Sequence, residues 1–461
     1  MKKLFLFVAL MLAICTTVLS QTQMNNWYIG PKKIDMTVSS PVPATINPAY
    51  GSTFAATATH IANGFYDNYT SATVHGNLIF YIADGTVYDY NNTAIGNIPN
   101  GGAEVAIVPF GTNSSVPCQR KYNLFSTAGG ITSPVGLWQT ELDMNSYSLS
   151  TPVQIDGVSF GTEFGALAVS KTYGAALDRY LYFMGGSGTI NSTAGQINKL
   201  IIHNNGTVST SVPLYPNPGI GVSNSNAGGE VFTKELELSP DGKWLAWASF
   251  AQVNNPFGTQ SRYHFLALNG NGDLDIATYG TVNVYQKFNI TGANYNVDSS
   301  GFRGIEFYKD ASGTKLFMGA GTDGIYSTPV AIPFTSAFTQ VSGSNNANLS
   351  LSFGFSQIEL ANNGYMYASS LSGGGGNNIG AFLPSSVAPQ ILSANSFPFA
   401  NPPKDIYSLG GSPNSTLYTL PDQIDGQNYS SIVQSPLVQV ATTNNFNFNT
   451  GTATWMSGAN P

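Results

Sequence analysis

The residues of this chain that could do chemistry lie in short, glycine-rich stretches. GVSFG, residues 157–161, has the G-x-S-x-G spacing that holds a nucleophilic serine on a tight turn between a strand and a helix. GAGTDG, residues 319–324, has the G-x-G-x-x-G spacing that places a pyrophosphate at a helix N-terminus. Neither stretch leads into a helical pattern. We therefore interpret the first as a β-turn and the second as a glycine-rich hairpin.

A third stretch, NGNGDLD at residues 269–275, alternates oxygen-bearing side chains as calcium-binding loops do. These side chains are Asn269, Asn271, Asp273 and Asp275. Leu274 stands where such a loop needs glycine, and Gly280 stands where it needs a bidentate glutamate. We expect a hairpin loop here and no metal site.

The other titratable residues form no catalytic or metal-binding motif. The four histidines, His60, His75, His203 and His264, lack zinc-ligand spacing. Cys118 is the only cysteine outside the first twenty residues, and a single thiol cannot form an internal disulfide. Asp241, in SPDGKW, is expected to order its turn through bonds to the backbone. The sequence thus predicts no catalytic residue and no cofactor.

The elements that carry these residues are short strands in a repeating pattern. ELELSPDGKWLAWAS, residues 235–249, places a polar turn between two alternating runs of apolar and aromatic residues. Similar turns lie near residues 76, 121, 179, 242, 313, 364 and 414, at gaps of 45 to 71 residues. Propeller blades take about 40–50 residues, whereas immunoglobulin-like sandwiches take about 100. The sequence therefore predicts an all-β fold with a single β-propeller of seven blades, with six or eight as alternatives.

The chain ends and the charge balance limit where this propeller works. Residues 1–20 carry two lysines before an apolar run too short to span a bilayer, which predicts a secretory signal peptide. The propeller is expected over residues 21–435, and residues 436–461 form a tail or the start of a missing module. Without the signal peptide the chain has 15 basic and 24 acidic residues, which disfavours nucleic-acid binding. We expect an extracytoplasmic protein, secreted, at the cell surface or in the periplasm, with no transmembrane segment after cleavage.

Several stretches resemble a known family. NNWYIGPKKIDM, residues 25–36, is similar to the N-N-W-Y-F-G-x-x-x-x-L-D-F opening of a family of secreted β-propeller proteins from Bacteroidetes. SQIELANNGYMYASS (356–370) and LYTLPDQIDGQNY (417–429) resemble its later strands, and SPDGKWLAWAS (239–249) resembles TolB-type and WD-like repeats. The motifs mark strands and no site. Family members often continue into type IX sorting or gliding-motility-associated modules, and no such module follows in this sequence.

Two functions fit these observations. The first is a non-catalytic propeller that binds a protein or a glycan, or serves as a structural part of the cell surface, because tyrosines and tryptophans can stack on sugars or anchor protein contacts. The alternative is a carbohydrate-active hydrolase or lyase on the same scaffold. Convergent carboxylates in an axial pocket would favour the enzyme. The sequence leaves the ligand and the oligomeric state open.

Overall fold

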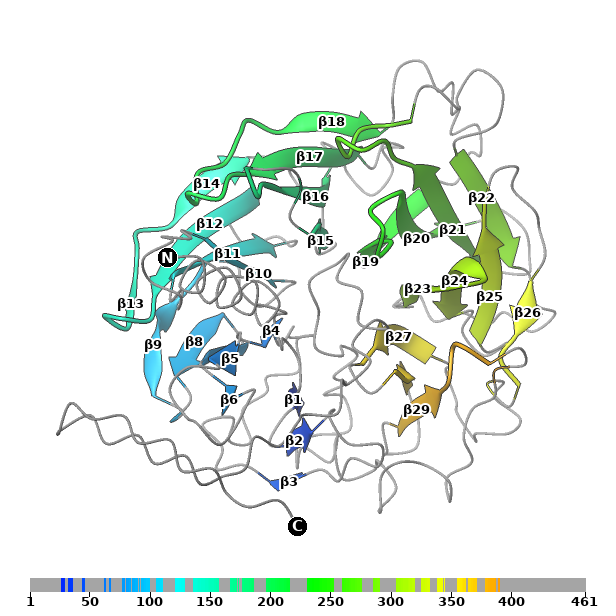
Figure 1. The fold of residues 1–461 in the computed structure, drawn as a ribbon, viewed down its shortest axis with the longest axis horizontal. Coiled ribbons are helices and arrows are strands. Elements are labelled where there is room, and N and C mark those ends of the chain that lie inside the picture. The colour runs from blue at the N-terminus through cyan, green and yellow to red at the C-terminus, as the bar shows by residue number, and fades with distance from the viewer. Residues whose placement is uncertain are drawn as a thin grey trace, which may run out of the picture.

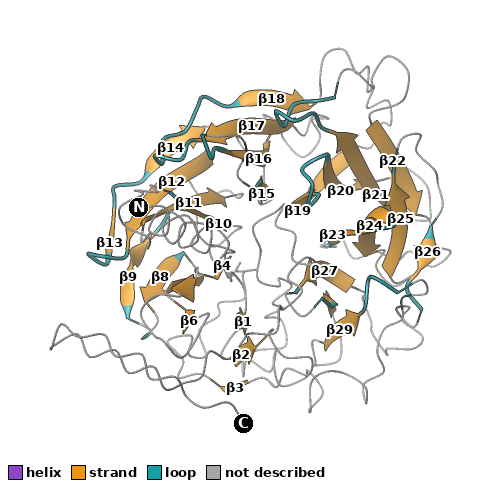
Figure 2. Cartoon of the chain, viewed as in Figure 1, coloured by secondary structure: helices purple, strands orange, loops and turns teal. Residues whose placement is uncertain are grey.

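The structure is a computed structural model, and it describes 29 strands with the short turns and loops next to them, between Asn26 and Pro389 with gaps. These described residues contain strands, turns and loops but no helix (Figure 2). The all-β prediction is therefore confirmed. Because the described part holds no helix, it also holds none long and apolar enough to cross a membrane.

Six sheets follow one another along the chain, and the strands within each are antiparallel. They are formed by β4 (Ala62–Asn63), β7 (Phe80–Ala83), β8 (Thr86–Asp89) and β9 (Ala94–Asn97); by β10 (Val105–Pro109), β11 (Lys121–Ala128), β12 (Gly136–Asp143), β13 (Ser148–Leu149) and β14 (Val153–Asp156); by β15 (Leu167–Val169), β16 (Arg179–Gly185), β17 (Gln196–Ile202) and β18 (Val212–Tyr215); by β19 (Glu230–Leu238), β20 (Trp244–Gln252), β21 (Thr259–Ala267) and β22 (Tyr285–Ile290); by β23 (Ile305–Asp310), β24 (Gly313–Gly319), β25 (Ile325–Val330) and β26 (Thr339–Gln340); and by β27 (Phe355–Leu360), β28 (Met366–Ser370) and β29 (Asn378–Phe382).

The remaining strands lie near the N-terminus. They are β1 (Asn26–Ile29), β2 (Lys32–Asp35) and β3 (Ala44–Thr45), which form one sheet, and the pair β5 (Tyr66–Asp67) and β6 (Asn77–Leu78).

The sheets are arranged radially around a common centre (Figure 1). The first strand of each sheet, such as β15, β19, β23 or β27, lies toward the centre, and the last strands lie outside. In the same view the sheet β1–β3 lies between β27–β29 and the sheet that contains β4. This arrangement is a β-propeller, which confirms the predicted fold class. The number of blades stays a prediction.

The hairpin at residues 235–249, on which the repeating sequence pattern is based, joins β19 to β20. Gly242, with a φ of 71°, closes the turn by donating its N–H to the carbonyl of Ser239 at 2.7 Å. The backbone N–H of Lys243 donates to Asp241 Oδ1 at 3.2 Å. The expectation that Asp241 orders this turn through the backbone is confirmed.

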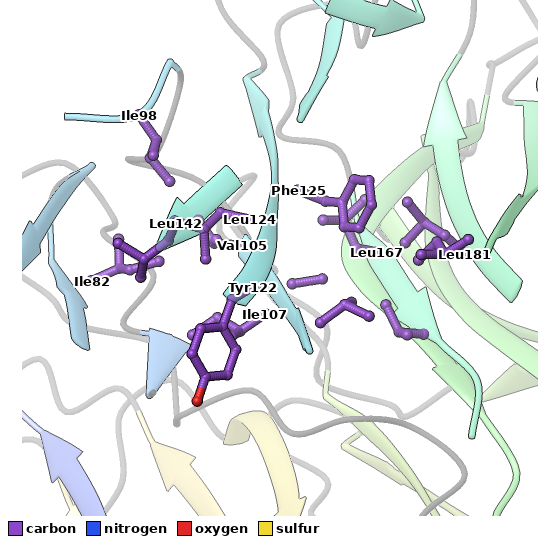
Figure 3. Packing of buried hydrophobic residues seen from close by; sticks show 14 of the residues in the cluster. Ile82, Ile98, Val105, Ile107, Tyr122, Leu124, Phe125, Leu142, Leu167 and Leu181 are labelled. Carbon is purple, nitrogen blue, oxygen red and sulfur yellow. The ribbon is translucent and has the colours of Figure 1, made fainter. Parts of the chain in front are cut away.

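Neighbouring sheets pack face to face through alternating residues. On β20, Leu245 and Trp247 belong to the core shared with β15–β18, whereas Trp244 and Ala246 belong to the core shared with β23–β26. Figure 3 shows another such core, nearer the N-terminus, where Leu124 of β11 and Leu167 of β15 come from different sheets. Both faces of an inner sheet are therefore covered, so that such strands alternate between two cores and not between core and solvent.

Three aromatic residues of the repeated strands, one from each of three sheets, are buried. Trp244, Phe317 and Tyr367 are exposed by 8%, 0% and 0%, and all three lie on the second strand of a sheet. Across the strand pairs, Phe317 lies opposite Glu306 and Tyr367 lies opposite Glu359. On β20, Ala246 lies opposite Glu237 and so corresponds to Phe317 and Tyr367, and Trp244 lies two positions before it in the same core.

Several predictions concern positions outside the described residues. They are the signal peptide at 1–20, the tail at 436–461, GVSFG at 157–161, residues 320–324 of GAGTDG, the turns near 76 and 414, Cys118, His60 and His75.

Candidate functional site

Polar and aromatic side chains gather where β15–β18 meets β19–β22. The turn 239–243 joins the first two strands of the second sheet, and the loop 269–275 follows its third strand. In an antiparallel sheet these two connections lie at the same end of the strands. We call this end of the sheets the turn edge. Its contacts with the preceding sheet form the candidate site.

The loop 269–275 is built around a lysine of the preceding sheet. Lys199, on β17, has a side chain only 6% exposed, and its Nζ lies 2.6 Å from Asp273 Oδ1 and 2.6 Å from the carbonyl oxygen of Asn271. The same Nζ lies 4.5 Å from the ring centroid of Tyr180. A buried charge is tolerated when it is paired and hydrogen-bonded. The ammonium group of Lys199 therefore binds two oxygens of the loop whose sequence resembles a calcium-binding loop.

The loop itself is a hairpin turn, as the sequence predicts. Leu268 and Leu274 form an antiparallel bridge, and Asn269 Oδ1 accepts the backbone N–H groups of Asn271 at 2.8 Å and Asp273 at 3.1 Å. The side chain of Asn269 is therefore used to fold the turn. The described residues contain no group of three or more His, Cys, Asp and Glu side chains that could hold a metal ion. Whether the loop responds to calcium remains a prediction.

The tip of this loop rests on two tyrosines. Tyr182, which is 1% exposed, donates its hydroxyl to the carbonyl of Gly272 at 2.8 Å. Gly272 has a φ of 69°, and a methyl group at this position would lie 2.6 Å from Cδ2 of Tyr180 and closer still to the Tyr182 hydroxyl. Glycine is required here by the backbone angle and by the space.

A second tyrosine contact supports the turn 239–243. The rings of Tyr173 and Tyr180 stack with centroids 4.9 Å apart and an interplanar angle of 29°. The hydroxyl of Tyr173 faces Gly242, where a methyl group would collide with it. Burial raises the pKa of Tyr173 to about 12 and also raises the pKa of Tyr180. Both phenols are therefore protonated at neutral pH and cannot act as general bases.

Asp241 links the same turn to the following sheet. Its Oδ2 accepts from Lys309 Nζ of β23 at 2.7 Å, and its Oδ1 accepts from Ser239 Oγ at 2.8 Å. Burial by itself raises the pKa of Asp241, but the hydrogen bonds from Lys309, Ser239 and the Lys243 backbone outweigh it and hold the pKa below its ordinary value. Asp241 is an ionised structural carboxylate at neutral pH.

The equivalent turn of β15–β18 docks on the sheet before it. Asn123 Nδ2 and Gln139 Nε2 each donate to the carbonyl of Gly206 at 2.9 Å. Next to this turn, His203 Nδ1 lies 3.2 Å from Asp178 Oδ2. The side chain of His203, one of the four scattered histidines, is thus used to hold two turns of its own sheet together. His264 lies on β21, opposite Trp247.

The turn edge can hold sheets together, and part of it is open to solvent. The Asp273 side chain is 51% exposed, and Leu177 is 42% exposed with a φ of 57°. Sequence reasoning singled out Asp241 and Asp273 but missed Lys199, Tyr182 and Lys309. Their partners are 68 to 90 residues away along the chain, so no local pattern reveals them.

No family model and no curated protein matches the chain. Among solved structures, the chain is similar to the β-propeller domain of Vanderwaltozyma polyspora Nup133, with 8% identity over 75% of this chain and 88% of that one and a TM-score of 0.37. It is also similar to a periplasmic gluconolactonase of Pseudomonas aeruginosa, with 12% identity over 74% and 96% of the two chains and a TM-score of 0.35.

A prolyl endopeptidase matches as well, with 10% identity, a TM-score of 0.33 and coverage of 66% of this chain. This chain spans only 39% of the length of that peptidase. At such identities and TM-scores the likenesses carry no inference about function.

Proposed function

We propose that this protein is an extracytoplasmic β-propeller that binds a protein or a glycan without catalysing a reaction. The observation that carries the proposal is the use of the charged groups at the turn edge. These groups form three pairs: Lys199 with Asp273, Lys309 with Asp241, and His203 with Asp178. A general acid or base must be free to exchange a proton with a substrate. These groups are held in structural contacts instead.

The composition of three segments between strands supports a binding role. Residues 186–195, 216–229 and 291–303 read GSGTINSTAG, PNPGIGVSNSNAGG and TGANYNVDSSGFR, and they are rich in glycine and in uncharged hydrogen-bonding residues. Amide and hydroxyl side chains with interspersed aromatic residues suit the hydroxyl groups and apolar faces of a glycan.

The predicted signal peptide supports the location. Two lysines followed by a short apolar run are typical of export, and the mature chain would carry a low density of charge that suits extracytoplasmic partners. Proteinase added to intact cells that express the full chain with a C-terminal tag would distinguish a surface location from a periplasmic one. Retention of the tag in the cytoplasm would contradict the proposal.

One experiment separates binding from catalysis. Residues 21–461 are run in native gels that contain soluble β-glucan, xylan or homogalacturonan, and the same mixtures are analysed for new reducing ends and for unsaturated products. We expect retarded migration in at least one gel and no products. Product formation in proportion to protein concentration would establish the hydrolase or lyase instead. The absence of retardation in every gel would direct the search to protein partners, by crosslinking at the cell surface.

A further inference from the structure

Three of the innermost strands carry a glutamate between two buried apolar residues. The triplets are Leu236-Glu237-Leu238 on β19, Ile305-Glu306-Phe307 on β23 and Ile358-Glu359-Leu360 on β27. Glu237 is 6% exposed and Glu359 is 2% exposed, so both carboxylates are buried inside the ring. We call these three residues the glutamate latch.

The three glutamates occupy the same position of their sheets. Each lies opposite a buried residue of the second strand: Glu237 opposite Ala246, Glu306 opposite Phe317, and Glu359 opposite Tyr367. The apolar neighbours of each glutamate pack into the core shared with the preceding sheet. Because side chains alternate along a strand, the glutamates are directed toward the following sheet.

One contact of the latch is seen directly. The backbone N–H of Leu360 donates to Glu306 Oε2 at 3.2 Å, which connects β23 to β27 of the following sheet. Ala361 donates its N–H to the carbonyl of Tyr365, so the N–H of its neighbour Leu360 points away from β28. The N–H of Leu360 therefore lies on the inner edge of the sheet, on the side of β27 where none of the described strands pairs with it. Glu306 supplies the acceptor that this edge lacks.

The same geometry recurs at β23. Gly319 donates its N–H to the carbonyl of Gly304, and by strand alternation the N–H of Phe307 points to the inner edge as that of Leu360 does. Phe307 follows Glu306 directly, as Leu360 follows Glu359. The neighbouring strand β19 contacts β23, and Glu237 is directed toward the sheet of β23 because its neighbours Leu236 and Leu238 pack into the preceding core.

We propose that each latch glutamate accepts a backbone N–H from the innermost strand of the next sheet. The donor is the residue that directly follows the latch position on that strand, and its N–H points to the inner edge. Glu237 binds the N–H of Phe307 as Glu306 binds that of Leu360. Glu359 binds the inner strand of the sheet that comes next in the ring, which is the sheet of β1–β3 in Figure 1. The last carboxylate thereby joins the end of the ring to the N-terminal part of the chain, and the latch contributes to ring closure.

Hydrogen exchange followed by mass spectrometry tests the direction of each contact. Glu306→Gln and Glu306→Leu are expected to increase exchange in the peptide that contains Leu360 and to leave β19 unchanged. Glu237→Gln is expected to act on the peptide with Phe307, and Glu359→Gln on the peptide with β1–β3. Since glutamine keeps one acceptor oxygen, it is expected to have a smaller effect than leucine, and it keeps the test valid if the leucine variants do not fold.

Thermal melting provides the second readout. Each leucine variant is expected to melt roughly 2–4 °C below the parent, the shift that the loss of one charged hydrogen bond gives in a chain of this length. Glu141→Gln is the matched control, because Glu141 is an exposed glutamate paired with Lys121 at the surface, and its melting temperature should stay within about a degree of the parent. Increased exchange in the mutated strand or the preceding sheet, and not in the following one, would overturn the latch. Leucine variants that melt at the same temperature as Glu141→Gln would overturn the latch as well.

Discussion

Gly272→Ala tests whether the loop 269–275 is held by its contact with the preceding sheet. Gly272 combines a φ of 69° with a carbonyl that accepts the Tyr182 hydroxyl at 2.8 Å. An alanine in the left-handed region costs about 1–2 kcal/mol. The added methyl group also meets Tyr180 and Tyr182, and loss of the hydroxyl hydrogen bond costs a further ~0.5–1.5 kcal/mol. The expected loss of stability is about 1.5–3.5 kcal/mol in total.

Two other glycines separate these contributions. Gly270 lies in the same loop, its φ is not positive, and it has open space where a methyl group would go. Gly364 has a φ of 82° and the same open space. Gly270→Ala is expected to be neutral or slightly stabilising, because alanine restricts the unfolded chain. Gly364→Ala is expected to lose only the ~1–2 kcal/mol of the backbone term.

Thermal melting and urea unfolding of the three variants give the comparison. A domain of 150–250 residues loses about 2–4 °C per kcal/mol, and a longer chain loses less, so Gly272→Ala should melt several degrees below the parent and below Gly364→Ala. If Gly272→Ala matches Gly364→Ala, the contact with the tyrosines contributes nothing. If it matches Gly270→Ala, the turn geometry described above is wrong.

Three further predictions use the same measurements. Trp244→Ala should cost about 3–5 kcal/mol, because it leaves a cavity between two sheets; a melting temperature within a degree of the parent would contradict its burial. The folded pKa of Asp241 lies below its ordinary value, so its stabilisation is present above the unfolded pKa of about 3.9 and is lost as the pH falls through the folded value. Asp241→Asn should accordingly be less stable than the parent at pH 7, and the difference in stability should shrink below about pH 4. A difference that does not change with pH would show that the charge of Asp241 does not contribute to stability. Melts in excess calcium and in chelator should coincide, because Lys199 already supplies a positive charge to the loop. A calcium-dependent rise that disappears in the Asp273→Ala, Asp275→Ala double variant would show a metal site.

The sequence was sufficient for the features that depend on neighbouring residues. Turn residues such as Asp241 and Gly242 act within four or five positions, so the hairpin around them could be predicted from the order of residues alone. The strand pattern also predicted the all-β propeller, since radial packing needs many short strands with apolar residues.

The glutamate latch was hidden by the same pattern. A glutamate between two apolar residues in a strand normally indicates a solvent-facing side. In this fold both faces of an inner strand are covered by neighbouring sheets, so Glu359 is buried to within 2% of full burial. Its position is informative only together with the radial arrangement, which is a tertiary property. The signal that could have found it is the recurrence of an apolar-Glu-apolar triplet just before a polar turn.

The two kinds of contact between sheets complement each other. β15 carries Ala168 at the latch position, opposite the buried Tyr182, so no latch carboxylate extends from this strand to β19. At this same seam Tyr182 and Lys199 hold the loop of the following sheet at the turn edge. Where the latch position carries alanine, the turn edge supplies the connection, and at the seam with β23–β26 the pair of Lys309 and Asp241 adds to the proposed contact of Glu237. The turn edge is thereby committed to holding the ring together.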